Sequence, residues 1–195
     1  MTSFDEMYEG TPPWDIGRPQ PVLARLVKNG ILRESPVLDV GCGTGENSLL
    51  LAAKGFDVTG VDSAPRAIEK AKQKAKVRKL KTTFLVHDAL ALAGLQKRFA
   101  SVIDSGLFHV FGNRERIQFR NQLHEVMRPG ATYFMMCMSE EEPAEWDGPR
   151  RVTQPEVRAA FAPPKFRVRS IEEARFATNM HEDGAYAYLC TIERP

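Results

Sequence analysis

Three glycines within five positions are the sharpest chemical signal in the chain. Gly41, Gly43 and Gly45 follow the apolar run 37–40 and precede a segment with helical spacing. Glycine is needed where the backbone turns tightly, or lies against a ligand with no Cβ between them. The ligand crevice of an open α/β sheet lies beyond the carboxyl ends of its strands. The turn, with Cys42 inside it, therefore predicts a loop beneath a nucleotide-like ligand.

The residue after the third glycine argues against a phosphate group in that ligand. A dinucleotide-binding loop has the spacing Gly-x-Gly-x-x-Gly, and Glu46 stands in place of the last glycine. A carboxylate in the first helical turn repels a pyrophosphate at the helix N-terminus. The loop therefore favours S-adenosylmethionine, which carries a nucleoside and a cationic sulfonium but no phosphate. The alternative is a turn that binds no ligand.

Carboxylates accompany three strand-like runs. Asp39 lies within the first run, Asp62 closes the second, and Asp88 with Ala89 follows the third. We expect Asp62, beside Ser63, to accept hydrogen bonds from both ribose hydroxyls, the alternative being a cap on the next helix. We expect Asp88 to accept a hydrogen bond from the adenine amine, the alternative being a solvated strand end. Together these acids predict a cofactor site around the glycine loop.

The segment after the fourth strand-like run is the expected place of the methyl acceptor. Asp104 and Ser105 are expected to contact the cofactor or its pocket, and His109 is the candidate group that orients or deprotonates the acceptor. The alternative for His109 is a packing histidine. Transfer from a sulfonium requires alignment of the reactants and exclusion of water more than a strong base. Candidates for an apolar acceptor site, or for plain core, are Phe108, Phe111 and Trp146.

Strand-like and helical segments alternate in the order that a doubly wound sheet requires. After a turn-rich leader, strands are expected at 37–40, 56–61, 83–86, 101–104 and 132–138, and helices at 46–54, 64–76, 114–127 and 154–161. Two last strand-like runs, 166–170 and 185–192, are expected to form an antiparallel hairpin. The predicted fold is α/β, a mostly parallel seven-stranded, Rossmann-like sheet with helices on both faces.

The composition indicates one ordinary domain spanning residues 1–195. The 27 Lys and Arg residues nearly balance 25 Asp and Glu, so the charge favours neither nucleic acid nor a membrane as partner. No run approaches the roughly 20 apolar residues that cross a bilayer. Three cysteines far apart predict no disulfide and no metal site. We expect a cytoplasmic monomer or homodimer.

Two charged segments have open interpretations. Residues 66–81 carry eight basic residues and one acid. We expect a solvated helix face, with an RNA-binding patch as the alternative. Residues 140–151 are the candidate flap over the acceptor, where Arg150 and Arg151 either meet an anionic acceptor or pair with the neighbouring glutamates.

These motifs resemble those of the class I S-adenosylmethionine-dependent methyltransferases. The run 37–45 is similar to their first motif, 58–64 and 86–89 to their second-strand and third-strand motifs, and 123–131 to the helix and turn before their fifth strand. The resemblance covers nearly the whole chain in the expected order. It implies a methyltransferase that binds S-adenosyl-L-methionine.

A narrower resemblance comes from the leader. Residues 10–21 are similar to the entry segment of the thiopurine, thiol and halide methyltransferases, whose bacterial relatives methylate tellurite or heterocyclic toxins, and 105–109 resemble the halide and thiol group. The resemblance implies a lid, residues 1–21, with Trp14 over the cofactor, where an aromatic face attracts a sulfonium. Trp14 as a hydrophobic plug is the alternative.

The resemblance implies a small-molecule acceptor, namely a thiol, a halide or a heterocyclic hydroxyl. Three alternatives remain open at this point. They are a nicotinamide-dependent oxidoreductase, a non-catalytic cofactor-binding regulatory protein and an RNA methyltransferase.

Overall fold

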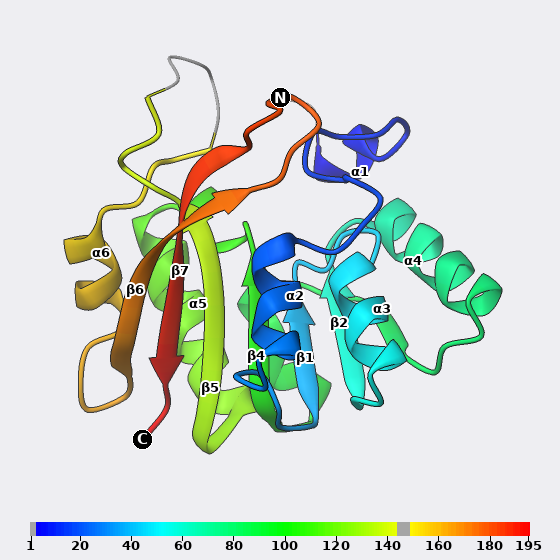
Figure 1. Ribbon diagram of the computed structural model, residues 1–195. Coiled ribbons are helices and arrows are strands. Elements are labelled where there is room, and N and C mark those ends of the chain that lie inside the picture. The colour runs from blue at the N-terminus through cyan, green and yellow to red at the C-terminus, as the bar shows by residue number, and fades with distance from the viewer. Residues whose placement is uncertain (1–2, 144–148) are drawn as a thin grey trace.

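The computed structural model describes residues 3–143 and 149–195, which form one seven-stranded sheet in the order β3-β2-β1-β4-β5-β7-β6 (Figure 1). Neighbours among β1 to β5 are parallel, whereas β7 is antiparallel to both β5 and β6. The predicted doubly wound sheet with a terminal antiparallel hairpin is therefore confirmed. The strands are β1 (Val37–Val40), β2 (Val58–Asp62), β3 (Thr83–Val86), β4 (Phe99–Ser105), β5 (Met127–Met138), β6 (Arg167–Phe176) and β7 (Ala185–Glu193).

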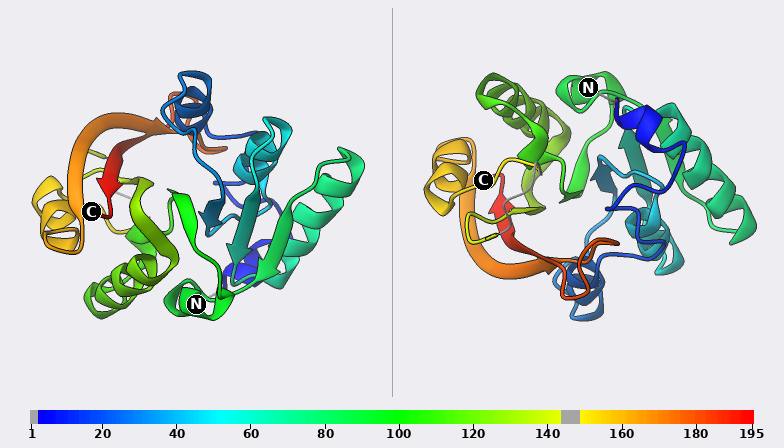
Figure 2. Two further views of the ribbon diagram at one scale, coloured as in Figure 1. Left: turned by 90° about the horizontal axis from the view of Figure 1, so that it is seen from below. Right: turned by 90° about the horizontal axis from the view of Figure 1, so that it is seen from above.

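Helices cover both faces of the sheet, as Figure 2 shows from below and from above. α2 and α3 lie on one face, and α5 lies on the other with the 3₁₀ helix η1. α4 packs beside α3 through an apolar cluster that includes Leu49, Ile68 and Phe84. The helices are α1 (Phe4–Met7), α2 (Pro21–Lys28), α3 (Glu46–Ala53), α4 (Pro65–Val77), η1 (Ala89–Leu95), η2 (Phe108–Val110), α5 (Asn113–Val126) and α6 (Gln154–Ala160).

The two faces explain why the central strands are continuously apolar. Successive side chains of a strand point to opposite faces, so Tyr133 belongs to the cluster under α5 and Phe134 to the cluster under α2 and α3. All four residues of β1 are buried. Burial of each large apolar side chain stabilises the fold by about 1.5–3 kcal/mol.

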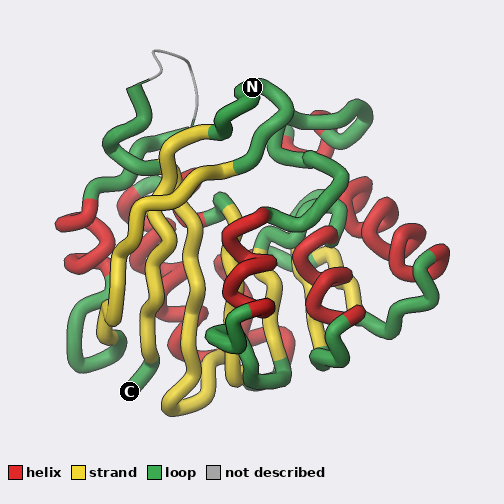
Figure 3. Tube along the Cα trace, in the orientation of Figure 1, coloured by secondary structure: helices red, strands yellow, loops and turns green. Residues whose placement is uncertain are grey.

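Two predicted boundaries were wrong at the hairpin side of the sheet. Arg128-Pro129-Gly130 was expected to separate the helix predicted at 114–127 from the strand predicted at 132–138. It lies inside β5, because Met127 already pairs with Phe99. β6 continues to Phe176, beyond the predicted end at residue 170, since the polar side chains of this edge strand hide the apolar signal. Figure 3 shows the resulting long strands.

The leader, which is the part of the chain before β1, was expected to be turn-rich. It contains two helices that were not predicted, α1 and α2. α2 begins with Pro21 at its first turn and buries Val22, Leu23 and Leu26. This apolar face and the following Asn29-Gly30 were the available signals. The leader crosses the carboxyl ends of the parallel strands, at the upper side of Figure 1.

None of the helices within 3–143 and 149–195 is long and apolar enough to cross a membrane. Those residues also contain no group of three His, Cys, Asp or Glu side chains that could hold a metal ion. Cys42, Cys137 and Cys190 are buried and are not joined by disulfides.

The β6–β7 connection generates a stability prediction. Gly184 has a φ of +71°, and a Cβ there would lie 2.3 Å from the backbone oxygen of Phe176. Gly55 has a φ of +87° but open space around it. We expect Gly184→Ala to lower the free energy of unfolding by about 3 kcal/mol, against about 1 kcal/mol for Gly55→Ala, because only the former adds a clash to the backbone strain. Urea unfolding measures both, and equal losses would contradict the expectation.

Candidate functional site

The glycine loop lies at the carboxyl end of β1, where the strand order reverses between β1 and β4. The backbone N–H groups of Gly41 and Cys42 both donate to the carbonyl oxygen of Val61, at 2.8 and 2.9 Å, which fixes the loop to β2. Gly45 precedes α3 with a φ of +84°, and a Cβ there would lie 2.7 Å from the Phe84 ring. Glycine is therefore required at this position by both backbone and packing.

Asp62 holds the glycine loop against the start of α4. Its Oδ2 accepts from the N–H of Gly43 at 2.8 Å, and its Oδ1 accepts from the N–H of Ala64 at 2.9 Å. Burial raises the pKa of Asp62, and the backbone hydrogen bonds oppose that shift. The helix cap that the sequence offered as an alternative is not formed, because α4 begins after Ala64 with no side-chain cap hydrogen bond. Each oxygen retains a second lone pair, so the predicted ribose contact stays a prediction, as does that of the exposed Ser63.

Asp39 is buried beside the loop and only half satisfied. Its side chain is 1% exposed, and its Oδ2 accepts from the Ser48 hydroxyl at 2.6 Å. Its Oδ1 has no hydrogen-bond partner within the described part of the chain. Burial raises the pKa of Asp39 to about 7, and the charges of Asp104 and Asp62 act in the same direction. A buried oxygen without a donor is a place where a ligand donor is expected.

Asp104 corrects one sequence expectation. The side chain is fully buried, and its oxygens accept from the N–H groups of Leu107 at 2.7 Å and Phe108 at 3.1 Å, and from the Tyr133 hydroxyl at 2.7 Å. Burial raises its pKa to about 6. Asp104 therefore positions the loop after β4 and presents no side-chain surface to a cofactor. Ser105, which follows it, is half-buried, and its predicted contact stays a prediction.

Asp88 lies at the end of β3, exposed to solvent. Its Oδ1 accepts from the N–H of Leu90 at 2.8 Å and so caps η1, which begins at Ala89. The cap was not predicted. It leaves the second carboxylate oxygen of Asp88 free of that role, and the expected adenine contact of Asp88 and Ala89 stays a prediction.

His109 is in a different protonation state from the one a base requires. The N–H of Met138 donates to its Nδ1 at 2.9 Å. Because a backbone N–H can only donate, the neutral ring carries its proton on Nε2. Burial and the nearby charge of Arg116 lower the pKa of His109 to about 3. The ring can donate a hydrogen bond through Nε2, but it has no free nitrogen lone pair to take a proton, which corrects its expected use as a base.

Trp14 lies in an aromatic group above the loop. Its indole N–H donates to the Tyr8 hydroxyl at 2.9 Å, and its ring meets those of Phe4 and Tyr8 edge-on. Tyr8 is buried, and a Cβ on Gly43 would lie 2.8 Å from its hydroxyl oxygen. Tyr8, which the sequence analysis did not single out, is thus a leader residue that touches the loop. The predicted cofactor contact of Trp14, which is 40% exposed, stays a prediction.

The basic segment 66–81 is largely exposed, as expected, but four of its basic side chains also bind other parts of the chain. Arg66 pairs with Asp5 and with Glu9, and Lys70 Nζ donates to the carbonyl oxygen of Tyr8 at 2.7 Å. These side chains hold the leader over α4. The exposed basic residues of the segment are Arg66, Lys72, Lys76, Arg78, Lys79 and Lys81.

Arg66 and Lys70 belong to a row of basic residues spaced by four, and the next two members, Lys74 and Arg78, reach the glycine loop. Lys74 and Arg78 both pair with Glu46, at 2.9 and 2.8 Å, and Lys74 Nζ donates to the Thr44 hydroxyl at 2.7 Å. That hydroxyl donates to Asp15 of the leader at 2.7 Å. The charge of Glu46 is thus balanced, and the predicted repulsion between Glu46 and a pyrophosphate loses its basis.

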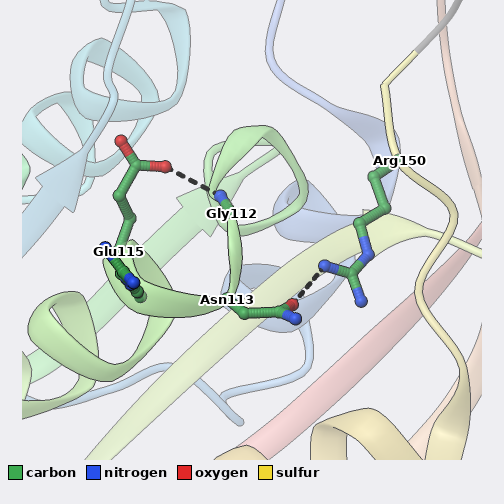
Figure 4. A pocket seen from close by; sticks show the side chains of 5 residues that line it. Gly112, Asn113, Glu115 and Arg150 are labelled. Carbon is green, nitrogen blue, oxygen red and sulfur yellow. Dashed lines mark hydrogen bonds between the residues drawn. The ribbon is translucent and has the colours of Figure 1, made fainter.

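The candidate flap is only partly described, because Trp146 lies outside the described residues. Phe108 is a core residue, which was one of its two predicted roles, and its ring centroid lies 5.5 Å from that of Phe161. Arg150 binds Asn113 and Glu156 rather than the glutamates at 140–142, whereas Arg151 Nε donates to the Glu142 carbonyl oxygen at 2.8 Å. A cavity of about 510 Å³ lies where Arg150 meets the start of α5 (Figure 4). Phe111 is half-buried against the core.

Comparison with known proteins identifies several similar chains. A family model described as "Methyltransferase domain" matches residues 37–130. The 2-heptyl-1-hydroxyquinolin-4(1H)-one methyltransferase of Mycobacteroides abscessus is 37% identical over 155 residues, which are 78% of this chain and 68% of that protein. The probable thiol methyltransferase 2 of Arabidopsis thaliana is 28% identical, over 68% of this chain and 59% of its own length.

Solved structures repeat the likeness. A structure described as "Conversion of a Disulfide Bond into a Thioacetal Group during Echinomycin Biosynthesis" superposes with a TM-score of 0.87 at 35% identity, over 98% of this chain and 90% of the other. Magnesium protoporphyrin IX methyltransferase from Synechocystis with bound SAM has a TM-score of 0.68 at 21% identity, over 88% of this chain and 76% of the other, and shares the fold.

The buried carboxyls predict how stability depends on pH. The pKa values of Asp39 and Asp104 are raised to about 7 and about 6, whereas the unfolded chain releases these protons near pH 4. The folded state therefore binds more protons between those values, and the free energy of unfolding falls as the pH rises from about 4 to about 7.

We expect Asp39→Asn to make this fall shallower, by on the order of a few kcal/mol in total, because one of the two carboxyls is gone. Denaturant unfolding at intervals between pH 4 and pH 8 measures the slope. Asp57→Asn is the control, since Asp57 is 62% exposed. A slope unchanged in Asp39→Asn but altered in Asp57→Asn would be the opposite of this expectation.

Proposed function

The chain belongs to the class I S-adenosylmethionine-dependent methyltransferases, and on that premise we propose that it methylates a heterocyclic hydroxyl of a small molecule with S-adenosylmethionine. Membership of this family sets aside the nicotinamide-dependent oxidoreductase. The observation that carries the proposal is the excess of buried carboxylate at the glycine loop, where the Oδ1 of Asp39 has no partner among the described residues and Asp62 lies nearby.

The residues at the loop fit this cofactor by charge. The charges of Asp104 and Asp62 raise the pKa of Asp39, and the charge of Asp62 also raises the pKa of Tyr8. A cation placed among these carboxylates is therefore favoured, and an anion is not. The basic side chains nearest the loop, Lys74 and Arg78, are occupied by Glu46. When bound, S-adenosylmethionine supplies a methyl group on a positively charged sulfur, with a neutral thioether as leaving group.

The proposed roles of the residues follow from their positions. The backbone at Gly41, Gly43 and Gly45 lies against the cofactor, Asp62 accepts from the ribose hydroxyls, and Asp88 accepts from the adenine amine. Backbone contacts come from Cys42, Ser63, Ala89 and Ser105. The leader, joined to α4 and to the loop, covers this side and excludes water, with Tyr8 and Trp14 as its aromatic contacts.

The acceptor class is inferred from the relative with the greater identity of the two reported. That protein's name gives a 1-hydroxyquinolin-4(1H)-one as its acceptor, and it is 37% identical to this chain. His109, neutral and protonated on Nε2, donates a hydrogen bond to the acceptor oxygen and holds it in line with the methyl group. Since His109 takes no proton, the hydroxyl must be acidic enough to ionise without it.

A binding and turnover experiment tests the proposal. We expect S-adenosylhomocysteine to bind the purified protein in calorimetry, and a panel of hydroxyquinolones, thiols, iodide and total RNA to yield methylated hydroxyquinolone. Asp62→Ala should weaken cofactor binding by about 1–3 kcal/mol through loss of charge-assisted hydrogen bonds, and the exposed Asp57→Ala should not. Binding without product on any acceptor would favour a regulatory protein, and product on RNA alone would favour an RNA methyltransferase.

The state of His109 predicts the pH dependence of catalysis. Its pKa of about 3 means that the ring stays neutral throughout the working range, so kcat/KM should show no ionisation of this group between pH 5 and pH 9. His109→Asn keeps an acceptor for the Met138 N–H but removes the Nε2 donor, and should lower kcat/KM about tenfold with the same profile shape. A limb near pH 6–7 that is present in the native enzyme and absent from the variant would show a base after all.

A further inference from the structure

Arg116 is a buried arginine that the protein leaves partly unsatisfied. Its side chain, on the first turns of α5, is 6% exposed by residue area. Neither Nε nor Nη2 has a hydrogen-bond partner among residues 3–143 and 149–195. Buried guanidinium donors are ordinarily paired, so an unpaired edge on such a group calls for a partner that binds from outside.

Glu156, the carboxylate that lies near Arg116 in the described part of the chain, does not neutralise it. Glu156 Oε1 lies 3.6 Å from Arg116 Nη1, and the same oxygen forms the ion pair with Arg150. The other oxygen, Oε2, accepts from the Thr153 N–H at 2.8 Å and caps α6. Among residues 3–143 and 149–195, two guanidinium groups therefore share one carboxylate, which cannot neutralise both. Burial lowers the pKa of Arg116, with the charge of Arg150 acting in the same direction.

Arg116 lies beside the residues that follow β4. Its Cζ lies 4.5 Å from the centroid of the Phe108 ring, and its charge contributes to the lowered pKa of the next residue, His109. Arg150, its neighbour in charge, lines the cavity at the start of α5, where Figure 4 shows its guanidinium turned toward Asn113. The Nε and Nη2 edge of Arg116 and the His109 ring therefore lie in one region at the carboxyl end of the sheet.

We propose that the Nε and Nη2 edge of Arg116 binds a negatively charged oxygen of the methyl acceptor and keeps that acceptor ionised. This edge offers two parallel N–H groups, the arrangement that a carboxylate or a conjugated oxyanion accepts. The proposal rests on the proposed function and adds the class of acceptor, an oxygen acid with a delocalised anion.

The chemistry balances without a protein base. The acceptor hydroxyl loses its proton to solvent before or on binding, because Arg116 stabilises the anion. In the transfer step the oxygen lone pair forms the new C–O bond while the C–S bond breaks, and its electron pair stays on sulfur. No proton moves in that step, which agrees with a His109 that is neutral and protonated on Nε2.

The test follows the ionisation of a bound probe. With S-adenosylhomocysteine in place, 1-hydroxyquinolin-4(1H)-one is titrated by absorbance in the presence of excess protein. We expect the native protein to lower the apparent pKa of the probe by about one unit or more, which is a tenfold preference for the anion. Arg116→Met should abolish that shift, and Arg116→Lys, which keeps the charge but not the paired edge, should retain part of it. A merely structural arginine would not change this signal.

Two further variants serve as controls of place and sign. Arg120 is one turn later on α5, and its Nη1 donates to the Ala160 carbonyl oxygen at 3.4 Å, so Arg120→Met should leave the probe pKa as in the native protein. Glu156→Gln keeps side-chain acceptors at the cap but removes the shared negative charge, so the probe pKa should fall further and KM for the anion should decrease severalfold.

Each outcome bears on one idea. A native protein that binds no S-adenosylhomocysteine, or methylates nothing, overturns the proposed function. A native protein that does both, with a probe pKa that Arg116→Met leaves shifted, overturns the role of Arg116 alone. If Arg116→Met fails to bind S-adenosylhomocysteine because it is misfolded, Glu156→Gln decides, and a probe pKa that does not fall there overturns the role as well.

Discussion

Desolvation of carboxylates at the reversal point of the sheet is the interaction on which the remaining structure depends. Asp39, Asp62 and Asp104 lie on the adjacent strands β1, β2 and β4, and a carboxylate taken out of water requires donors or a proton. Asp104 receives three donors and thereby orders the chain up to η2. Asp62 receives two and thereby orders the glycine loop. Asp39 is left one donor short, so the groups that build the crevice also determine the charge that it prefers.

The charged surface of α4 is part of the same construction. Arg66, Lys70 and Lys74 bind the leader and the glycine loop, while the opposite edge of the leader is bound by the β6–β7 connection, where the Asn179 N–H donates to the Pro13 carbonyl oxygen at 2.8 Å. The leader is thus attached to two elements far apart in the chain. Its position over the strand ends follows from tertiary pairing, with short helices of its own that would be unstable alone.

Local patterns in the sequence were sufficient to predict the sheet and the glycine loop. They could not predict hydrogen bonds and ion pairs between residues far apart in the chain. Apolar runs and the glycine spacing are local, so β1, β3 and the loop were predicted at their observed positions. The tautomer of His109 depends on Met138, and the balance of the negative charge of Glu46 depends on Lys74 and Arg78. In each case the partner lies far away in the sequence, so no local pattern indicates the interaction.

Arg116 and Tyr8 escaped the sequence reading for the same physical reason. Arginine on an amphipathic helix and tyrosine in a short leader ordinarily face solvent, and only the packed fold buries them. α2 differs, because its N-terminal proline and its apolar face are visible in the sequence and could have predicted the helix. The candidate site was therefore predictable on the side of the glycine loop and much less so beyond β4.

The strand order also divides the molecule in a way that matters for its evolution. β3, β2, β1 and β4 come from one continuous stretch of chain, and β5, β7 and β6 come from the stretch that follows. The two halves meet along the β4–β5 ladder, at the contact between Asp104 and Tyr133, between η1 and α5, and where the leader binds the β6–β7 connection. Genetic recombination near residue 106 that preserved this seam would exchange the half with Arg116 and leave the half with the glycine loop intact, so new acceptors can arise on an unchanged donor half.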